Sequence, residues 1–88
     1  MNYRIEFTAG AENQYIKIFN TNKKLSSRIQ NSLQNISSNP YSGKRLVGEL
    51  KGKFSYRVGN YRIIYRIDNE IITVYILNIE KRGSVYRN

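Results

Sequence analysis

The chain has 88 residues, enough for one hydrophobic core and too few for a second, so we expect a single domain over residues 1–88. Fifteen Lys and Arg against six Asp and Glu give a formal net charge of +9, which makes a polyanion the expected partner. The absence of Cys and His excludes disulfides, thiolate metal ligands and histidine acid–base chemistry. We therefore expect no metal and no cofactor.

The positive charge has two alternative roles. It could serve only to keep the chain in solution. Binding to an anionic membrane surface is less favoured, because neither predicted helix has a basic face opposite a bulky apolar one. No apolar stretch is long enough to cross a bilayer, and Met1 leads directly into patterned sequence without a signal core, so a cytoplasmic location is expected.

The first half of the chain predicts a strand followed by a helical hairpin. Tyr3 to Phe7 alternate with period two, as in a half-buried strand, and Thr8 stands where a helix N-cap would. The apolar stripe of the first helix is Ala11, Tyr15, Ile18 and Phe19, and that of the second is Leu25, Ile29, Leu33 and Ile36. Asn20 to Asn22 separate the helices, and Asn39-Pro40 ends the second.

The second half predicts an antiparallel β-meander. A short strand is expected around Leu46 to Leu50, within a loop-like region. Phe54 to Val58 and Tyr61 to Ile67 both alternate and are joined by Gly59-Asn60, a tight hairpin turn. Ile71 to Ile79 is β-branched, as in a buried central strand. The expected fold is α+β, with both helices on one face of the sheet and the other face open.

The hairpin turn determines which side chains share the open face. A two-residue turn pairs Arg57 with Arg62. The apolar face, which receives the helices, carries Phe54, Tyr56, Val58, Tyr61, Ile63, Tyr65 and Ile67. The opposite face carries Ser55, Arg57, Arg62, Ile64 and Arg66. Three arginines are thus predicted to lie together on the uncovered side of the sheet.

Two arginines directly across from each other repel, at a cost of roughly a few tenths to 1 kcal/mol unless an anion lies between them. In a purely structural role, each guanidinium turns into water or finds one of the six acidic side chains. We favour a phosphate site, because the planar guanidinium binds phosphate oxygens in pairs. The tail after the last strand adds Lys81, Arg82, Arg87 and Tyr86, although charged tails are usually solvated.

Taken together, these segments resemble the RelE/ParE toxin superfamily, and in particular its RelE-like messenger RNA interferases. The resemblance covers nearly the whole chain. It is carried by Asn39-Pro40, by Leu46 to Gly52, by Tyr56 to Tyr65, and by Lys81-Arg82 with Val85-Tyr86. It implies the RelE-like microbial RNase fold, a toxin of a type II toxin–antitoxin system, and a hetero-oligomer with an antitoxin that blocks the site.

The resemblance also implies an activity: metal-independent, ribosome-dependent cleavage of messenger RNA in the A site, which inhibits translation. Arg62, Arg82 and Tyr86 match arginine and tyrosine positions of the RNA-cleaving members, and Arg57 falls where some have lysine. The catalytic set is therefore Arg57, Arg62, Arg82 and Tyr86, with Lys51, Lys53, Arg66, Lys81 and Arg87 as RNA-binding residues. The chain departs from the family pattern at Ser55, where a lysine can stand, and at Lys81, where many relatives have histidine.

Two alternative functions use the same fold. A ParE-like toxin would inhibit DNA gyrase through protein contacts and would not need the nucleolytic residues. A non-catalytic module would bind RNA or the ribosome through its basic sheet and its eight tyrosines.

Overall fold

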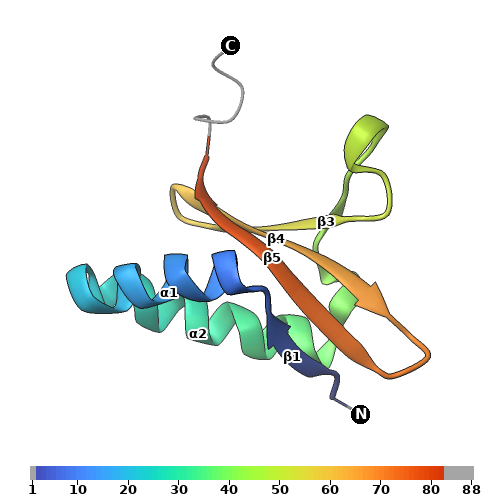
Figure 1. Cartoon of the computed structure of the whole chain (residues 1–88), viewed down its shortest axis with the longest axis horizontal. Helices are drawn as coiled ribbons and strands as arrows, with labels where there is room; N and C mark the ends of the chain where they lie inside the picture. Colours follow the sequence, from blue (N-terminus) through green and yellow to red (C-terminus); the bar gives the residue numbers. More distant parts are fainter. Residues whose placement is uncertain (1, 83–88) are drawn as a thin grey trace.

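The computed structural model describes residues 2–82 and confirms the predicted α+β architecture (Figure 1). Its strands are β1 (Arg4–Phe7), β2 (Lys44–Arg45), β3 (Phe54–Val58), β4 (Tyr61–Asp68) and β5 (Thr73–Lys81). They form one sheet in the order β1-β5-β4-β3-β2. β1 runs parallel to β5, and the other neighbours are antiparallel.

The helices α1 (Ala9–Thr21) and α2 (Lys23–Ser38) form the predicted hairpin. The Thr8 side chain caps α1 by accepting from the Ala11 N–H at 3.2 Å. Asn22 caps α2 in the same way, accepting from the Leu25 N–H at 3.0 Å. α2 ends just before Asn39-Pro40, as predicted, and a 3-10 turn, η1 (Pro40–Ser42), follows.

Both helices cover one face of the sheet, and the core lies between these two layers. The least exposed large side chains come from both layers: Ile29, Ile36, Ile63, Tyr65, Val74 and Ile76. Every residue assigned from the sequence to the apolar face of β3 and β4 is in this core or packed against it. Phe19 is the exception in the helix stripes: it is 42% exposed, and its ring lies against Tyr15 and beneath Lys23.

The predicted β3–β4 hairpin is confirmed, with all five pairs in the expected register from Val58↔Tyr61 to Phe54↔Tyr65. Gly59 has a φ of 58°, a left-handed conformation that a two-residue hairpin turn requires and that glycine adopts without steric cost. Arg57 and Arg62 are therefore directly opposite each other.

The strand predicted around Leu46 to Leu50 is wrong. The short edge strand is β2, and the segment instead forms the connection to β3, including a 3-10 turn, η2 (Gly48–Leu50). The chain has to reverse direction here so that β2 can pair with β3, and Gly48 and Gly52 have φ values of 70° and 92°. Both glycines thus supply the turn that an extended strand would have prevented.

The last strand begins and ends two residues later than the sequence pattern predicts. Ile71 is exposed and Ile72 has a φ of 49°, so both belong to the turn after β4. At its other end, β5 includes Glu80 and Lys81, which the sequence pattern assigns to the tail. The pairing of β4 with β5 shifts by one residue between Ile64 and Tyr65, which leaves Leu77 as an extra residue on β5.

Candidate functional site

The site is built on the face of the sheet that the helices leave uncovered, near the β3–β4 turn. Arg57 and Arg62 are paired there, but their environments differ. Arg57 is exposed, and no ion pair or hydrogen bond of its side chain occurs within the described residues 2–82. Arg62 is only 8% exposed. The uncovered face is therefore not uniformly open to solvent.

Glu80 supplies the negative charge beside Arg62. The Nε and Nη2 atoms of Arg62 each lie 2.8 Å from Glu80 Oε2, and the two residues are paired across β4 and β5. The side chains are 10% and 13% exposed, so this ion pair is largely shielded from water. Arg62 is therefore paired with an acidic side chain, which is the purely structural role considered above. The negative charge of Glu80 offsets the repulsion between Arg62 and Arg57.

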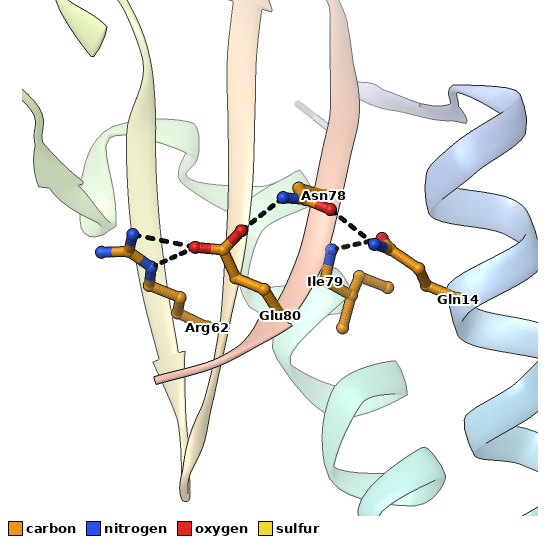
Figure 2. Close-up of polar contacts among 5 residues, drawn as sticks. All are labelled: Gln14, Arg62, Asn78, Ile79 and Glu80. Atoms are coloured by element: carbon orange, nitrogen blue, oxygen red, sulfur yellow. Dashed lines mark hydrogen bonds and ion pairs between the residues drawn. The ribbon is translucent and has the colours of Figure 1, made fainter. Parts of the chain in front are cut away.

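A chain of hydrogen bonds continues from Glu80 to helix α1 (Figure 2). Asn78 Nδ2 donates to Glu80 Oε1, and Gln14 Nε2 donates to Asn78 Oδ1 at 2.6 Å. Gln14 Oε1 accepts from the Ile79 backbone N–H at 2.8 Å. A backbone N–H can only donate, so this bond fixes which way the Gln14 amide points. The orientation of Asn78 and the acceptor role of Glu80 follow in turn.

The end of β1 explains why a helix side chain contacts β5 at this point. β1 pairs with β5 only as far as Phe7 opposite Ile76, so the rest of that edge of β5 has no neighbouring strand. Thr8, the residue after β1, binds the next two carbonyl oxygens along this edge of β5. Its N–H donates to Ile76 O at 3.0 Å, and its Oγ1 donates to Leu77 O at 3.3 Å. Gln14 then satisfies the Ile79 N–H, as buried backbone groups require.

Sequence reasoning does not identify Glu80, Asn78 or Gln14. It assigns Glu80 to the tail, and the other two are polar residues without a motif. The missing signal is the register of β4 with β5. A uniform continuation of the pairing from Asp68↔Thr73 would set Ile79 opposite Arg62, and only the extra residue in β5 brings Glu80 there.

Arg66 and Ile64 lie on the same face farther from the turn. The Arg66 guanidinium carbon is 4.2 Å from the ring centre of Tyr75, its partner across β4 and β5. This cation–π contact gives Arg66 a structural role, although its side chain remains exposed. Ile64 is only 6% exposed and leaves little open surface between Arg62 and Arg66.

The predicted residues after β5 are partly described. The Arg82 N–H donates to Asn60 O at 2.6 Å, which places Arg82 beside the β3–β4 turn, at the same end of the sheet as Arg57 and Arg62. Lys81 is paired with Tyr61, whose ring packs against the core, so Lys81 belongs to the helix side of the sheet. Tyr86 and Arg87 lie outside the described residues.

Lys51 and Lys53 lie at the other end of β3, in the loop that joins it to β2. With Arg45 they line a hollow of about 230 Å³. Four residues of strand separate Lys53 from Arg57, or about 13 Å. These lysines therefore do not reach the Arg57–Arg62 pair, and they extend the basic surface away from it.

Residues 2–82 contain neither a cluster of acidic metal ligands nor a membrane-spanning helix. No group of three or more Asp or Glu side chains is arranged to hold a metal ion there. Within the same part of the chain, no helix has both the length and the apolar character needed to span a membrane.

The comparisons with known proteins agree with this geometry. A family model described as the ParE toxin of type II toxin–antitoxin systems matches residues 5–86. The toxin RelG of Mycobacterium tuberculosis is 38% identical over 88 residues, 99% of each chain. The chain therefore belongs to the ParE toxin family, the toxins of type II toxin–antitoxin systems, and its similarity to RelG gives it RelE-like character.

Solved structures show the same fold. The toxin–antitoxin complex RelBE2 from Mycobacterium tuberculosis contains a chain that is 36% identical, with a TM-score of 0.80 over 93% of this chain and 100% of that one. A YoeB–YefM complex from Staphylococcus aureus matches with a TM-score of 0.78 at 23% identity, covering 93% and 99%. The expected superfamily and fold are thus confirmed.

Proposed function

We propose that this toxin is a metal-independent endoribonuclease that cleaves messenger RNA in the ribosomal A site and thereby inhibits translation. The observation that carries the proposal is the arginine pair beside the β3–β4 turn. Arg57 is exposed next to Arg62, whose orientation is set by Glu80, and Arg82 lies at the same end of the sheet. An RNA phosphate is the anion that suits the arginine pair on the uncovered face, with a third arginine at the same end of the sheet.

The proposed reaction is attack of a ribose 2′-oxygen on the adjacent phosphorus. A bond forms between the 2′-oxygen and phosphorus, and the bond from phosphorus to the 5′-oxygen of the next nucleotide breaks. The 2′-hydroxyl loses its proton and the leaving oxygen gains one, which gives a cyclic phosphate and a free 5′-hydroxyl. No metal or cofactor takes part.

The arginines have separate roles in this reaction. Arg57 and Arg62 stabilise the negative charge that grows on the phosphorane oxygens. Arg82 neutralises or protonates the leaving oxygen, and Tyr86 stacks on a base or assists the proton transfer. Lys51, Lys53, Arg66 and Arg87 bind the RNA backbone on either side, whereas Lys81, on the helix side of the sheet, is not part of this surface.

The lack of histidine shapes the expected kinetics. A site without a group of pKa near 7 is poorly matched to both proton transfers, so its rate depends mainly on positioning and charge stabilisation. The ribosome supplies the alignment of the message in this scheme. We therefore expect slow cleavage of free RNA and much faster cleavage of A-site message.

A cognate antitoxin is the proposed partner. The RelBE2 relative was solved as a toxin–antitoxin complex, and its matching chain aligns over its full length with 93% of this chain. We propose the same kind of hetero-oligomer here, with the antitoxin blocking access of RNA to the arginine pair. The positive charge of the toxin favours an antitoxin segment rich in Asp and Glu.

The experiment is cleavage of message on programmed ribosomes by the purified toxin. Wild-type protein should cut in the A site, and Arg57→Ala should reduce the rate at least tenfold. Arg4→Ala removes the same charge from the exposed edge strand β1 and should cut like wild type. Message left intact by wild-type protein would refute the nuclease.

A ParE-like gyrase inhibitor is the second candidate, because the matching family model is that of the ParE toxin. Incubation with gyrase and supercoiled DNA tests it directly. Linearised DNA together with intact message would establish the gyrase inhibitor. Ribosome binding with neither product would establish a non-catalytic binding module.

A further inference from the structure

We propose that Gln14, Asn78 and Glu80 form a positioning relay that holds the guanidinium of Arg62 in the orientation needed for phosphate binding. The inference rests on the proposed function, since it assigns these residues to the same reaction. None of the three touches RNA in this scheme, so each is a positioning residue that acts through Arg62. Figure 2 shows the four side chains in sequence across β4, β5 and α1.

Arg62 needs such support because an arginine side chain has many rotatable bonds and its catalytic value depends on orientation. Glu80 Oε2 binds the Nε and Nη2 atoms, on the side of the guanidinium nearest the aliphatic stem. A guanidinium also has a second fork, formed by Nη1 and Nη2 at its tip. Phosphate binding at that tip would leave both contacts of Glu80 in place, so the two contacts with Glu80 do not by themselves exclude phosphate binding.

Glu80 is itself held in place. Its second oxygen, Oε1, accepts from Asn78, so neither carboxylate oxygen depends on water for a partner. Gln14 in turn fixes Asn78, and Gln14 is anchored by a backbone N–H of the sheet. Each bond fixes the donor or acceptor role of the next group, so a reversed amide at Gln14 would present the wrong atom at every later step.

In a simpler role, Gln14 would only accept the hydrogen bond of the Ile79 N–H at the edge of β5. Gln14→Glu separates this role from the relay, because the new carboxylate still accepts from the Ile79 N–H but has lost the donor to Asn78. Asn78 must then turn its NH₂ toward residue 14, which directs its oxygen at the carboxylate of Glu80. The hydrogen bond to the Ile79 N–H is kept in this variant, whereas the hydrogen bond from Asn78 to Glu80 is lost. Gln34→Glu, on the exposed surface of α2, is the matched control for charge.

The direct readout is hydrogen exchange of the Arg62 Nε–H, followed by NMR and assigned by its disappearance in Arg62→Lys. We expect slow exchange in wild type and in Gln34→Glu, and exchange at least tenfold faster in Gln14→Glu. Asn78→Asp should give the same acceleration. Equal exchange in Gln14→Glu and Gln34→Glu would overturn the relay, whether or not the protein cuts RNA.

The kinetic readout is cleavage on programmed ribosomes. Gln14→Glu should lower kcat about tenfold and leave KM within about twofold, since Arg62 acts mainly in the transition state. In an Arg62→Lys background, the same change should have less than a twofold effect, because lysine has no planar fork to orient. An effect of equal size in both backgrounds would also overturn the relay.

The two hypotheses fail separately. If wild-type protein leaves message intact, the nuclease is refuted and the exchange experiment still decides whether the relay holds Arg62. If wild-type protein cuts message and Gln14→Glu matches Gln34→Glu in both exchange and kcat, the relay is refuted and the nuclease stands.

Discussion

Arg57 and Arg62 are direct neighbours across β3 and β4, but only Arg62 is neutralised, by Glu80 at 2.8 Å. The pair therefore combines a shielded guanidinium of defined orientation with an exposed one that can adapt to its ligand. For a site that must bind and then stabilise a changing phosphate geometry, this division is useful. It also separates the two arginines experimentally, because only one contributes to the fold.

Arg57→Ala should impair cleavage without impairing stability. The substitution removes an exposed charge beside another arginine, so the free energy of unfolding should stay the same or rise by a few tenths of a kcal/mol. Urea titration gives this value, with Arg4→Ala as the control. Destabilisation by more than about 1 kcal/mol would show that Arg57 makes stabilising contacts of its own in the folded state.

Glu80→Gln should destabilise the protein, because it removes the carboxylate that neutralises the buried Arg62 at 2.8 Å. We expect a loss of about 3 kcal/mol in the free energy of unfolding, measured by urea titration. Glu70→Gln is the control: Glu70 is exposed in the β4–β5 turn, where its backbone N–H bonds to Asp68 at 3.0 Å. Similar stabilities for the two variants would mean that the ion pair contributes nothing to the fold.

Gly43→Ala should also destabilise, for a steric reason. A Cβ at Gly43 would collide with the Tyr65 hydroxyl and lie 2.9 Å from the Ser55 carbonyl oxygen, so the β2 connection must shift. A loss of about 1–3 kcal/mol is expected in thermal or urea unfolding. Gly10→Ala serves as the opposite case, since the α1 position is open and alanine favours a helix. The free energy of unfolding of Gly10→Ala should rise by up to about 1 kcal/mol.

Tyr65 should make the stability of the fold fall between pH 10 and 12. Burial raises the pKa of Tyr65 to about 12, and its hydroxyl donates to Pro40 O at 2.7 Å. The unfolded chain, with an ordinary tyrosine pKa near 10, therefore loses this proton first as pH rises. The stability from Tyr65 is fully present below pH 10 and declines by about 2 kcal/mol as pH approaches 12.

The measurement is the difference in unfolding free energy between wild type and Tyr65→Phe at several pH values. The difference should be largest below pH 10 and should shrink above it, while the other tyrosines and the lysines cancel. A difference that stays constant from pH 8 to 12 would contradict the raised pKa.

Local patterns in the sequence are sufficient for most of the architecture. Period two identifies β3 and β4, Gly59-Asn60 sets their register, and the register alone places Arg57 opposite Arg62. Thr8 and Asn39-Pro40 mark where α1 begins and α2 ends. These features succeed because turns and caps depend on neighbouring residues, whose chemistry can be read without knowing the rest of the fold.

Features that depend on distant segments do not follow from local patterns. The segment from Leu46 to Leu50 is apolar enough for a strand, but the path from β2 to β3 requires a reversal there. Glu80 resembles part of the tail, because nothing local shows that β5 extends far enough for Glu80 to pair with β4. Gln14 is an ordinary helix residue until the early end of β1 leaves the Ile79 N–H for it to bind.

By itself, the sequence determined the helices, the β3–β4 hairpin, the arginine pair and the family. Only the tertiary structure decided what neutralises Arg62. One extra residue in β5, at Leu77, moves the register by a single position, which turns Ile79 into the core and brings Glu80 opposite Arg62. Because side chains alternate along a strand, that one-residue shift replaces an apolar residue opposite Arg62 with a charged one. No local sequence pattern predicts the shift.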